Sequence, residues 1–530
     1  MIPHEHATPG SEPPAGQKAR RAVTVALAVS ICLTPIFLWN DALHSPFLKL
    51  DDFVYLARDR SPASLFHNML TPHNAHVVPL FAIQNHLLAR LAGRLEAVPR
   101  VWGIACYVQL LLAMIVAGLL VASETGRSSL ALATMAGVGM STVLGPAVLW
   151  YSAGQALGSG SLILTMLLAL RLWRSRGGWF FLVLAVLAAV AAPLYWSAGY
   201  VAGAVGLAYL LVDRRVSRGI ALVPLGASVL TGVLVWTLAG TRIARSAPEE
   251  ATAWQTIARI PTGVAHTVQA IPEVLILNNL GLNATTTLPQ AAALCLLLAL
   301  AWRVSRKAVD LSAAGDRGGW RWLPRPNPLE AAGVTLAVAC FVMIYSARGY
   351  QSFANLRSLG WYHAIPQLGA VLFATGWMAG QRDRSPEQAL GESTFREVLW
   401  LAVFAAGLLI LQSPRASRVL YEYDGMASKM ETREDPRIQG PRSRADLIRR
   451  SEKQRLALAR LDRLEILCKE HQLGREHVRS VLGRRLIPGM PSHLADLDAF
   501  DLLEIPEQGA GDLVPGNRDL LRDFAAERTL

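Results

Sequence analysis

Two adjacent carboxylates and two imidazoles stand close together near the start of the chain. Asp51 and Asp52 come soon after an apolar block that ends near Trp39, and His73 and His76 follow a short distance later. Carboxylates and imidazoles are the usual general bases and acids of enzymes. They can also bind a divalent metal, but no third clear ligand accompanies them here. The pattern therefore favours acid–base chemistry or hydrogen bonding within a loop over a metal site, and no cofactor is expected.

The adjacency of the two aspartates has an electrostatic consequence. Asp51 and Asp52 are like charges, and both are expected near lipid of low dielectric constant. Either effect raises the pKa of a carboxyl group toward the range useful for a general base. The structural alternative is a solvated pair, or a helix whose first turn is capped by Asp51.

A second group of polar residues lies late in the chain. Arg348 and Arg357 stand beside aromatic residues and an imidazole, Tyr362 and His363. An arginine can bind two phosphate oxygens at once, so this group is suited to a phosphate-bearing ligand. The alternative is anchoring at a membrane surface, where Trp and Tyr are enriched.

The elements that must position these residues are membrane helices. The chain has 530 residues, of which 52% are hydrophobic and only 17% are charged, below the roughly 25% typical of soluble domains. The apolar residues gather in blocks near the ~20 residues that cross a bilayer as a helix. These blocks predict an all-α, polytopic transmembrane bundle of about eleven spans, at roughly 22–40, 101–122, 128–148, 156–172, 179–194, 198–212, 219–239, 289–302, 330–347, 364–380 and 397–412.

The basic residues predict how the bundle is oriented. The net charge is +12, but most Lys and Arg fall in short loops between apolar blocks or in the tail, so nucleic acid is not an expected partner. Arg127, Arg174 and Arg176 are examples in alternate loops. Cytoplasmic loops carry such an excess of positive charge. We therefore expect a multi-pass protein of the inner (plasma) membrane, with its N-terminus in the cytoplasm.

This orientation divides the chain into three parts. Residues 1–21 are expected to be a disordered cytoplasmic N-terminus, 22–412 the multi-span domain, and 413–530 an extracytoplasmic helical tail. The first apolar block lacks a small-residue cleavage site and is interpreted as an uncleaved anchor. Three segments of the multi-span domain are expected outside, the first of them large: 41–100, 240–288 and 347–363.

The tail is the one sizeable segment without apolar blocks. Ser443 resembles a helix N-cap, and the helix is expected to run to His471, with Gly474 as a stop. Leucines at every third position from Leu458 to Leu467 form one apolar stripe. Such a stripe favours a helix that packs on the membrane domain or on a partner over a catalytic role.

The first-loop residues carry a resemblance to a known class of enzymes. An aspartate pair just after the first span, followed by His73-Asn74-Ala75-His76-Val77-Val78-Pro79-Leu80 before the second, resembles the GT-C class of integral membrane glycosyltransferases. The protein O-mannosyltransferases and the lipid A aminoarabinose transferases belong to that class. The expected topology is also similar. The chain departs from the class in having Asp-Asp where several members have Asp-Glu or Glu-Asp, and in its longer, Arg-rich tail.

The resemblance implies a reaction. Such enzymes transfer a sugar from a polyprenyl-phosphate carrier to a glycan, lipid or protein acceptor on the outer side of the membrane, with inversion at the sugar. A first-loop aspartate acts as general base on the acceptor hydroxyl, and Asp52 is favoured here with Asp51 orienting the acceptor or the loop. The residues implied in substrate binding are His73, Asn74, His76, Arg348, Arg357, Tyr362 and His363.

Two functions of other kinds compete with this hypothesis. One is a flippase or transporter of a lipid-linked glycan, and the other is a non-catalytic subunit of envelope assembly whose tail helix is the working part. No Asp, Glu, Lys or Arg falls in the centre of an expected span. Charges at that depth mark ion-coupled carriers, so their absence from the spans argues against coupled transport. Only the enzyme requires a carboxylate on the outer face.

Overall fold

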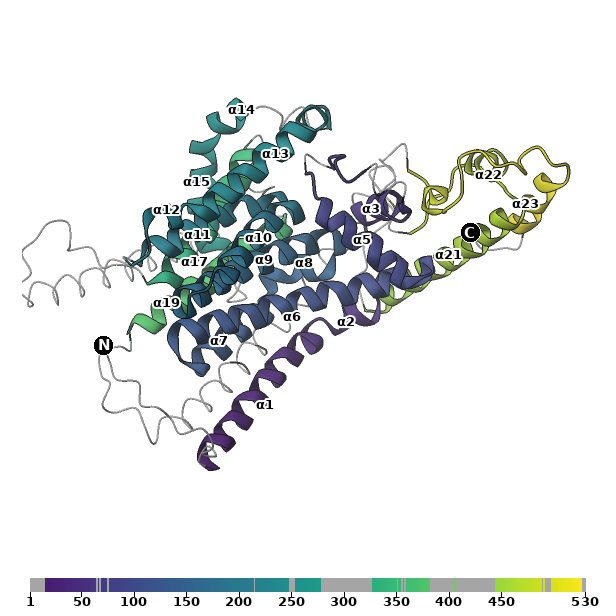
Figure 1. Ribbon diagram of the computed structural model, residues 1–530. Helices are drawn as coiled ribbons and strands as arrows, with labels where there is room; N and C mark the ends of the chain where they lie inside the picture. The colour runs from purple at the N-terminus through teal and green to yellow at the C-terminus, as the bar shows by residue number, and fades with distance from the viewer. Residues whose placement is uncertain are drawn as a thin grey trace, which may run out of the picture.

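The fold is helical throughout the part of the chain that the computed structural model describes. That part comprises residues 15–246, 253–277, 327–381 and 444–526, with residues 405 and 409. Short gaps within it fall at 63–64, 66–67, 74–75, 214, 350, 354–355, 357–358, 489 and 491–496. The expected block at 289–302 lies outside these residues, as does nearly all of the block at 397–412. Every regular element of the described residues is a helix (Figure 1).

Several of the helices are suited to a membrane. Four of those described are long and apolar enough to cross it, or up to five if one bent pair is a single span. They are α6 (Val98–Thr125), α9 (Tyr151–Arg176), the helix region around α13 (Val223–Ser246), α17 (Pro328–Ala347), and the pair formed by α7 (Ser128–Gly139) with η2 (Thr142–Leu144) and α8 (Gly145–Leu149), which is bent by 44°. The expected total of about eleven spans stays a prediction.

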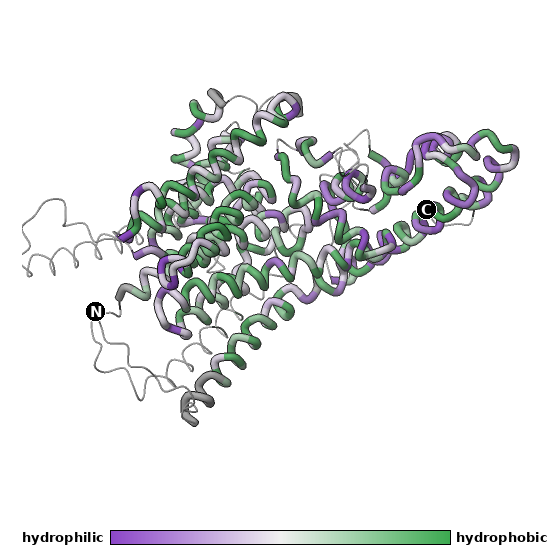
Figure 2. The backbone as a smooth tube through the Cα atoms, in the orientation of Figure 1, coloured by the Kyte–Doolittle hydropathy of each residue, from purple (hydrophilic) through white to green (hydrophobic). Residues whose placement is uncertain are grey.

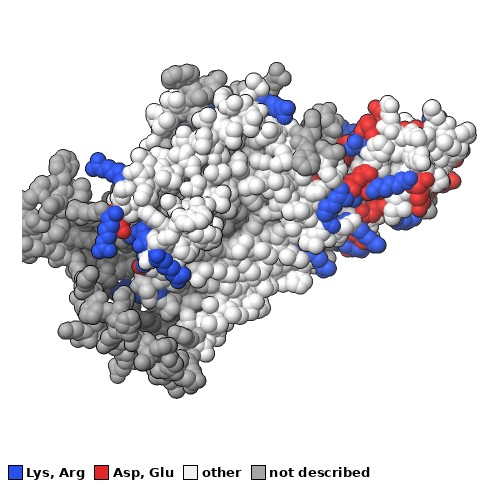
Figure 3. Space-filling view, viewed as in Figure 1, with Lys and Arg blue, Asp and Glu red and all other residues white. Residues whose placement is uncertain are grey.

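The bundle contains further apolar helices. They are α1 (Ala15–Leu38), α10 (Trp179–Tyr195), α11 (Val201–Leu211) and α19 (Ala364–Gln381). Figure 2 shows these helices and the long ones as mostly apolar. On the face drawn in Figure 3, most charged side chains gather toward the two ends of the molecule, and the broad surface between them carries few. This pattern is that of a multi-pass membrane protein.

The boundary between α10 and α11 is a tight turn. Pro193 lies inside α10, which ends two residues later at Tyr195. Trp196 is extended, and the short 3₁₀ helix η3 (Ser197–Tyr200) then leads into α11. Gly199 lies directly against the backbone of Ala192, where a side chain has no room. The turn places Ser197 at the end of the bundle that carries the first predicted outer segment.

That first segment is itself mostly helical. It contains α2 (Asn40–His44), α3 (Asp51–Asp59), α5 (Pro79–Ala92) and η1 (Leu95–Ala97). Helix α3 packs on α5, and α5 packs on α6 and α10. Helix α5 buries Phe81 and Asn85 and leaves Leu87 and Leu91 exposed.

The described part of the second predicted outer segment is also helical. Within 240–288, the structure places α14 (Ala253–Ala258), α15 (Ile260–Ala270) and the π-helix η4 (Ile271–Leu277). Helix α15 packs along α17, and buried residues of η4 join the main hydrophobic core. The sequence did not predict these helices, because polar residues interrupt the apolar pattern on which the spans were recognised.

The tail forms a small helical unit against the first segment. It contains α21 (Arg444–Glu470), α22 (Arg475–Leu482), η8 (Ala499–Leu502) and α23 (Asn517–Ala526). The expected N-cap, Ser443, lies outside the described residues. Leu458, Leu461 and Leu464 of the expected stripe are buried in one core cluster with Phe53 and Leu56 of α3. In Figure 1 this unit extends from the end of the bundle where α3 and α5 lie.

The crossing of α17 and α19 depends on two glycines. A Cβ added to Gly333 of α17 lies 2.6 Å from the Gly369 carbonyl oxygen of α19, and one added to Gly369 lies 2.6 Å from the Ala337 nitrogen. Small residues allow such backbone approach between membrane helices. Backbone atoms cannot rotate away as the end of a side chain can. A larger residue at either glycine therefore forces α17 and α19 apart.

We therefore predict that Gly333→Ala destabilises the protein by about 1–3 kcal/mol, as overpacking of a close-packed core does. Gly226→Ala in α13 is the control, because nothing lies within 4 Å of a Cβ at that position. Thermal unfolding in detergent, followed by tryptophan fluorescence, should show a lower midpoint for the first variant and no loss for the second. Equal midpoints for Gly333→Ala and the parent protein contradict the packing described.

Candidate active site

The two aspartates begin helix α3, but the chain reaches them through an unusual backbone conformation. Leu50, which precedes the helix, has φ 45° and ψ −111°. A positive φ is rare for a residue with a branched side chain and persists only when its surroundings enforce it. The amides of Asp52 and Phe53 donate to the Lys49 and Leu50 carbonyls, at 2.9 and 3.2 Å. These bonds begin α3 directly at the aspartate pair.

Asp52 is an internal anchor between two helices. Its side chain is 1% exposed. Oδ2 accepts from the Lys49 amide at 3.0 Å, while Oδ1 accepts from the Ser152 amide at 2.9 Å and from the Ser152 hydroxyl. Ser152 lies in the first turn of α9, so the carboxylate meets the positive ends of both α3 and α9. This contact fixes α3 to the centre of the bundle.

Burial dominates the ionisation of Asp52. Loss of solvent raises its pKa from 3.8 to about 7, although the bonds from Ser152 and Lys49 and the charge of the Lys49 ammonium act to lower it. The sequence argument expected one raised pKa in the pair. The structure traces it to burial rather than to the neighbouring carboxylate.

Asp51 faces the opposite way, toward solvent and the histidine segment. Its side chain is 29% exposed, and Oδ1 lies 3.2 Å from Nε2 of His73. The His73 ring rests edge-on against Tyr55 of α3, with 5.0 Å between ring centroids. A partly exposed carboxylate beside an imidazole is able to reach a proton on a bound molecule, which the buried Asp52 cannot do without a change of structure.

The histidine segment is held by its own backbone and by the α10–α11 turn. The amides of His73 and His76 each donate to the other residue's carbonyl, at 2.9 Å in both directions. Nδ1 of His76 lies 2.6 Å from the Ser197 hydroxyl. Burial lowers the pKa of His76 to about 3, and the positive charge of Arg348 acts in the same direction. His76 is therefore a neutral imidazole at neutral pH.

Arg348 and Tyr362 reach the same region from the other half of the chain. Arg348 follows the last turn of α17, and its guanidinium carbon lies 5.7 Å from the centre of the Tyr362 ring. Tyr362, in the short helix η6 (Gly360–His363), stacks on Trp196 with 6.2 Å between centroids. Trp196 directly precedes Ser197, the partner of His76. The arginine, both histidines and Asp51 thus form one cluster.

His363 points elsewhere. Its side chain is 3% exposed, and Nε2 lies 3.3 Å from the Tyr345 hydroxyl of α17. Burial lowers its pKa to about 3. His363 therefore packs into the helix bundle rather than into the cluster around Asp51. Asn74 and Arg357 lie outside the described residues.

A buried polar network below the cluster was not predicted from the sequence. Asn85 of α5 donates to Asp59 Oδ2 at 2.8 Å and accepts from the Tyr151 hydroxyl at 2.7 Å. Gln84 then donates to the same Tyr151 oxygen at 3.0 Å. These bonds join the C-terminal end of α3 to α5 and α9, as Asp52 joins its N-terminal end. Their partners are far apart in the sequence, which is why spacing alone gave no signal.

The described residues contain no group of three His, Cys, Asp or Glu side chains placed to hold a metal ion. His73 and Asp51 are adjacent, but His76 bonds to Ser197 instead. The cluster consists of a carboxylate, two imidazoles and a guanidinium, which together can accept a proton and bind an anion.

Comparison with known proteins gives limited similarity. No protein-family model matches the chain, and neither does any curated protein. Among solved structures it is similar to an oligosaccharyltransferase from Archaeoglobus fulgidus tethered to an acceptor peptide with an NVT sequon, at 13% identity and a TM-score of 0.41, covering 74% of this chain and 55% of that one. It is also similar to the archaeal oligosaccharyltransferase AglB from Archaeoglobus fulgidus in complex with an inhibitory peptide and a dolichol-phosphate. There the identity is 14% and the TM-score 0.42, with 80% of this chain and 59% of that one covered. The chain thus spans a little over half the length of the structures it matches.

The burial of Asp52 predicts a pH dependence of stability. Its pKa is about 7 in the folded protein against 3.8 when unperturbed, so the folded state holds this proton more strongly. The resulting stabilisation is complete below pH 3.8 and is lost as the pH rises through 7. Asp52→Asn cannot ionise, so its unfolding midpoint relative to that of the parent protein should rise steadily from pH 4 to pH 8.

The matched control is Asp519→Asn, whose parent side chain is 75% exposed in the tail. Its midpoint should follow that of the parent protein at every pH. Parallel curves for Asp52→Asn and the parent protein show that the Asp52 carboxyl is not buried as described.

Proposed function

We propose that the chain is an integral membrane glycosyltransferase that transfers a sugar from a polyprenyl-phosphate donor to an acceptor hydroxyl on the extracytoplasmic side. The observation that carries this proposal is the cluster at one end of the bundle. It holds a partly exposed carboxylate, Asp51, in one site with a neutral imidazole, His76, and a guanidinium, Arg348. A base and an anion-binding group in one site are what transfer from a phosphate leaving group requires. The likeness of the first segment to GT-C enzymes supports the same reaction.

The geometry favours exchanging the roles that the sequence assigned to the two aspartates. Asp51 is exposed enough to reach an acceptor, whereas both oxygens of Asp52 already accept hydrogen bonds from the protein. We therefore assign the general base to Asp51 and the positioning of α3 to Asp52. The raised pKa of Asp52 is then a consequence of its structural role.

The proposed reaction is a single inverting displacement. Asp51 accepts the proton of the acceptor hydroxyl as the hydroxyl oxygen bonds to the anomeric carbon of the sugar. The bond from that carbon to the phosphate oxygen breaks on the opposite face, and its electron pair leaves with the polyprenyl phosphate. Arg348, supported by its contact with the Tyr362 ring, stabilises the negative charge on the phosphate.

The other substrate-binding assignments follow from position. His73 pairs with Asp51 and holds the carboxylate toward solvent, and His76 bonds to Ser197 at the edge of the cluster. Asn74 and Arg357 stay proposed contacts on the strength of the sequence. His363 is proposed to support the donor side indirectly, through Tyr345 and the neighbouring Tyr362. The acceptor class, whether glycan, lipid or protein, is left open by this chemistry.

Membrane orientation is part of the proposal. The tail contacts the first segment directly, since the Gln454 side chain bonds to the Leu48 backbone. Two segments in contact outside the bilayer must lie on the same side of it. If the N-terminus is cytoplasmic, as the basic loops indicate, the first segment and the tail are both extracytoplasmic.

Alkaline phosphatase fused after Leu530 should therefore be active in a Gram-negative host, because it folds only outside the cytoplasm. A green fluorescent protein at the same point should stay dark. The reverse result places the tail in the cytoplasm, and the cluster with it.

The enzymatic proposal is tested by the single variants Asp51→Asn and Asp52→Asn, purified in nanodiscs and assayed for sugar transfer from a polyprenyl-phosphate donor. Asp51→Asn should lower turnover by about 10²–10⁴, the usual effect of losing a general base, without loss of folding. Asp52→Asn should change stability as well as turnover. Asp519→Asn, in the exposed part of the tail, is the activity control.

Each outcome bears on the assignment. An inactive Asp52→Asn beside a fully active Asp51→Asn restores Asp52 as the base. If both variants keep the turnover of the parent protein, the enzymatic proposal fails, and a flippase or an assembly subunit replaces it.

A further inference from the structure

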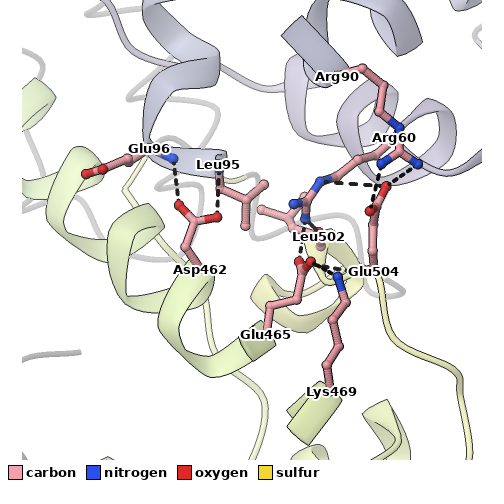
Figure 4. Close-up of polar contacts among 9 residues, drawn as sticks. All are labelled: Arg60, Arg90, Leu95, Glu96, Asp462, Glu465, Lys469, Leu502 and Glu504. Carbon is pink, nitrogen blue, oxygen red and sulfur yellow. Dashed lines mark hydrogen bonds and ion pairs between the residues drawn. The ribbon is translucent and has the colours of Figure 1, made fainter. Parts of the chain in front are cut away.

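The tail contacts the chain just after the C-terminal end of α3, the helix that begins with the two aspartates. Arg60, the residue after α3, forms an ion pair with Glu465 of α21 at 2.7 Å and donates to the Leu502 carbonyl at 2.5 Å. Glu504 lies 4.0 Å from Arg60 and 3.2 Å from Arg90 of α5. Figure 4 shows these side chains converging from the two parts of the chain.

A second contact joins the tail to the start of α6. Asp462 of α21 accepts from the backbone amides of Leu95 and Glu96, at 2.8 and 3.1 Å. Both amides lie in η1, just before α6, where amides have no helical partner. The tail is thus fixed to the bundle independently of α3 (Figure 4).

The third contact lies directly before the aspartates. Gln454 of α21 is 1% exposed. Its amide oxygen accepts from the Leu48 amide at 2.7 Å, and its amide nitrogen donates to the Leu48 carbonyl at 2.9 Å and to the Pro488 carbonyl at 2.5 Å. One side chain thereby satisfies both backbone groups of Leu48, as a neighbouring strand would.

The chain between Leu48 and Asp51 must keep a costly conformation. Leu50 has φ 45°, and such a residue stays in place only when both of its flanks are held. On the following side, Asp52 is fixed by the Ser152 amide at 2.9 Å. On the preceding side, Lys49 donates its amide to Asp52 and accepts from Trp150 at its carbonyl, at 3.1 Å. One residue before Lys49, the bonds from Gln454 fix Leu48.

We infer that Gln454 is a positioning residue of the glycosyl transfer: by holding Leu48 it fixes the turn at Leu50 and thereby the direction of the Asp51 carboxylate. This inference rests on the proposed function, because Gln454 touches no reacting atom. It gives the tail a role in catalysis rather than in packing alone. A misplacement of about 1 Å at a reacting group can cost about 10²-fold in rate.

The test compares three variants of the full-length protein in nanodiscs. Gln454→Ala removes all the side-chain bonds to Leu48. Gln454→Glu keeps an acceptor for the Leu48 amide but loses the donor to its carbonyl. Lys453→Ala changes the adjacent, exposed position of the same helix and serves as the control.

We expect Gln454→Ala to lower kcat by up to about 10²-fold, because the Asp51 carboxylate is no longer held in the correct direction. The KM for donor or acceptor should change little, because the substrate-binding residues are not altered. Gln454→Glu should fall between the parent protein and Gln454→Ala, and Lys453→Ala should match the parent protein. Hydrogen exchange of a peptide covering residues 46–56 supplies a measurement that needs no activity. Its exchange should be faster in Gln454→Ala and unchanged in Lys453→Ala.

Each combination of exchange rate and kcat supports or overturns the inference. Faster exchange with an unchanged kcat shows that Gln454 holds the segment without affecting catalysis, which overturns the inference. Unchanged exchange overturns it at the structural step. If Gln454→Ala fails to fold, a Gln454→Glu variant that folds with the turnover of the parent protein overturns it as well. If the parent protein has no transfer activity, the proposed function is refuted. If the parent protein is active and its kcat does not change when Gln454 is replaced, only the inference about Gln454 is refuted.

Discussion

The contact between the Asp52 carboxylate and the first turn of α9 determines where the first segment lies on the bundle. One buried side chain receives hydrogen bonds from the amides of Lys49 and Ser152, and so joins two helix starts that are 100 residues apart. A charge in such a place is costly unless its hydrogen bonds are complete. Because both oxygens are occupied, α3 has one favoured position, and every distance from Asp51 to the other groups follows from it.

The rest of the cluster is assembled on this fixed helix. His73 meets Asp51 on its exposed side, the α10–α11 turn brings Ser197 to His76, and α17 ends where Arg348 meets Tyr362. These groups lie in loops or at helix ends rather than within the long apolar helices. The bundle therefore supports the cluster at the ends of its helices.

The sequence predicted those parts that depend on local pattern. Apolar blocks indicated the helices around α6, α9 and α17, and the residue types alone identified Asp51, His73, His76 and Arg348 as candidates. It could not show that Asp52 is buried while Asp51 is partly exposed, because that difference depends on contact with a serine far along the chain. For the same reason it gave no sign of Gln454. The helices α14 and α15 were missed because polar residues interrupt their apolar residues into short runs.

The bonds between Gln454 and Leu48 join residues 406 positions apart. Synthesis from the N-terminus delivers the aspartates long before the tail, and contacts of such sequence separation close late. During biogenesis the Leu50 turn is therefore held only by the contacts of Lys49 with Asp52 and Trp150 until the tail has been synthesised and folded. Maturation of the proposed site is in this way tied to synthesis of the tail: a chain whose synthesis stops before Gln454 contains both aspartates but lacks the side chain that holds Leu48.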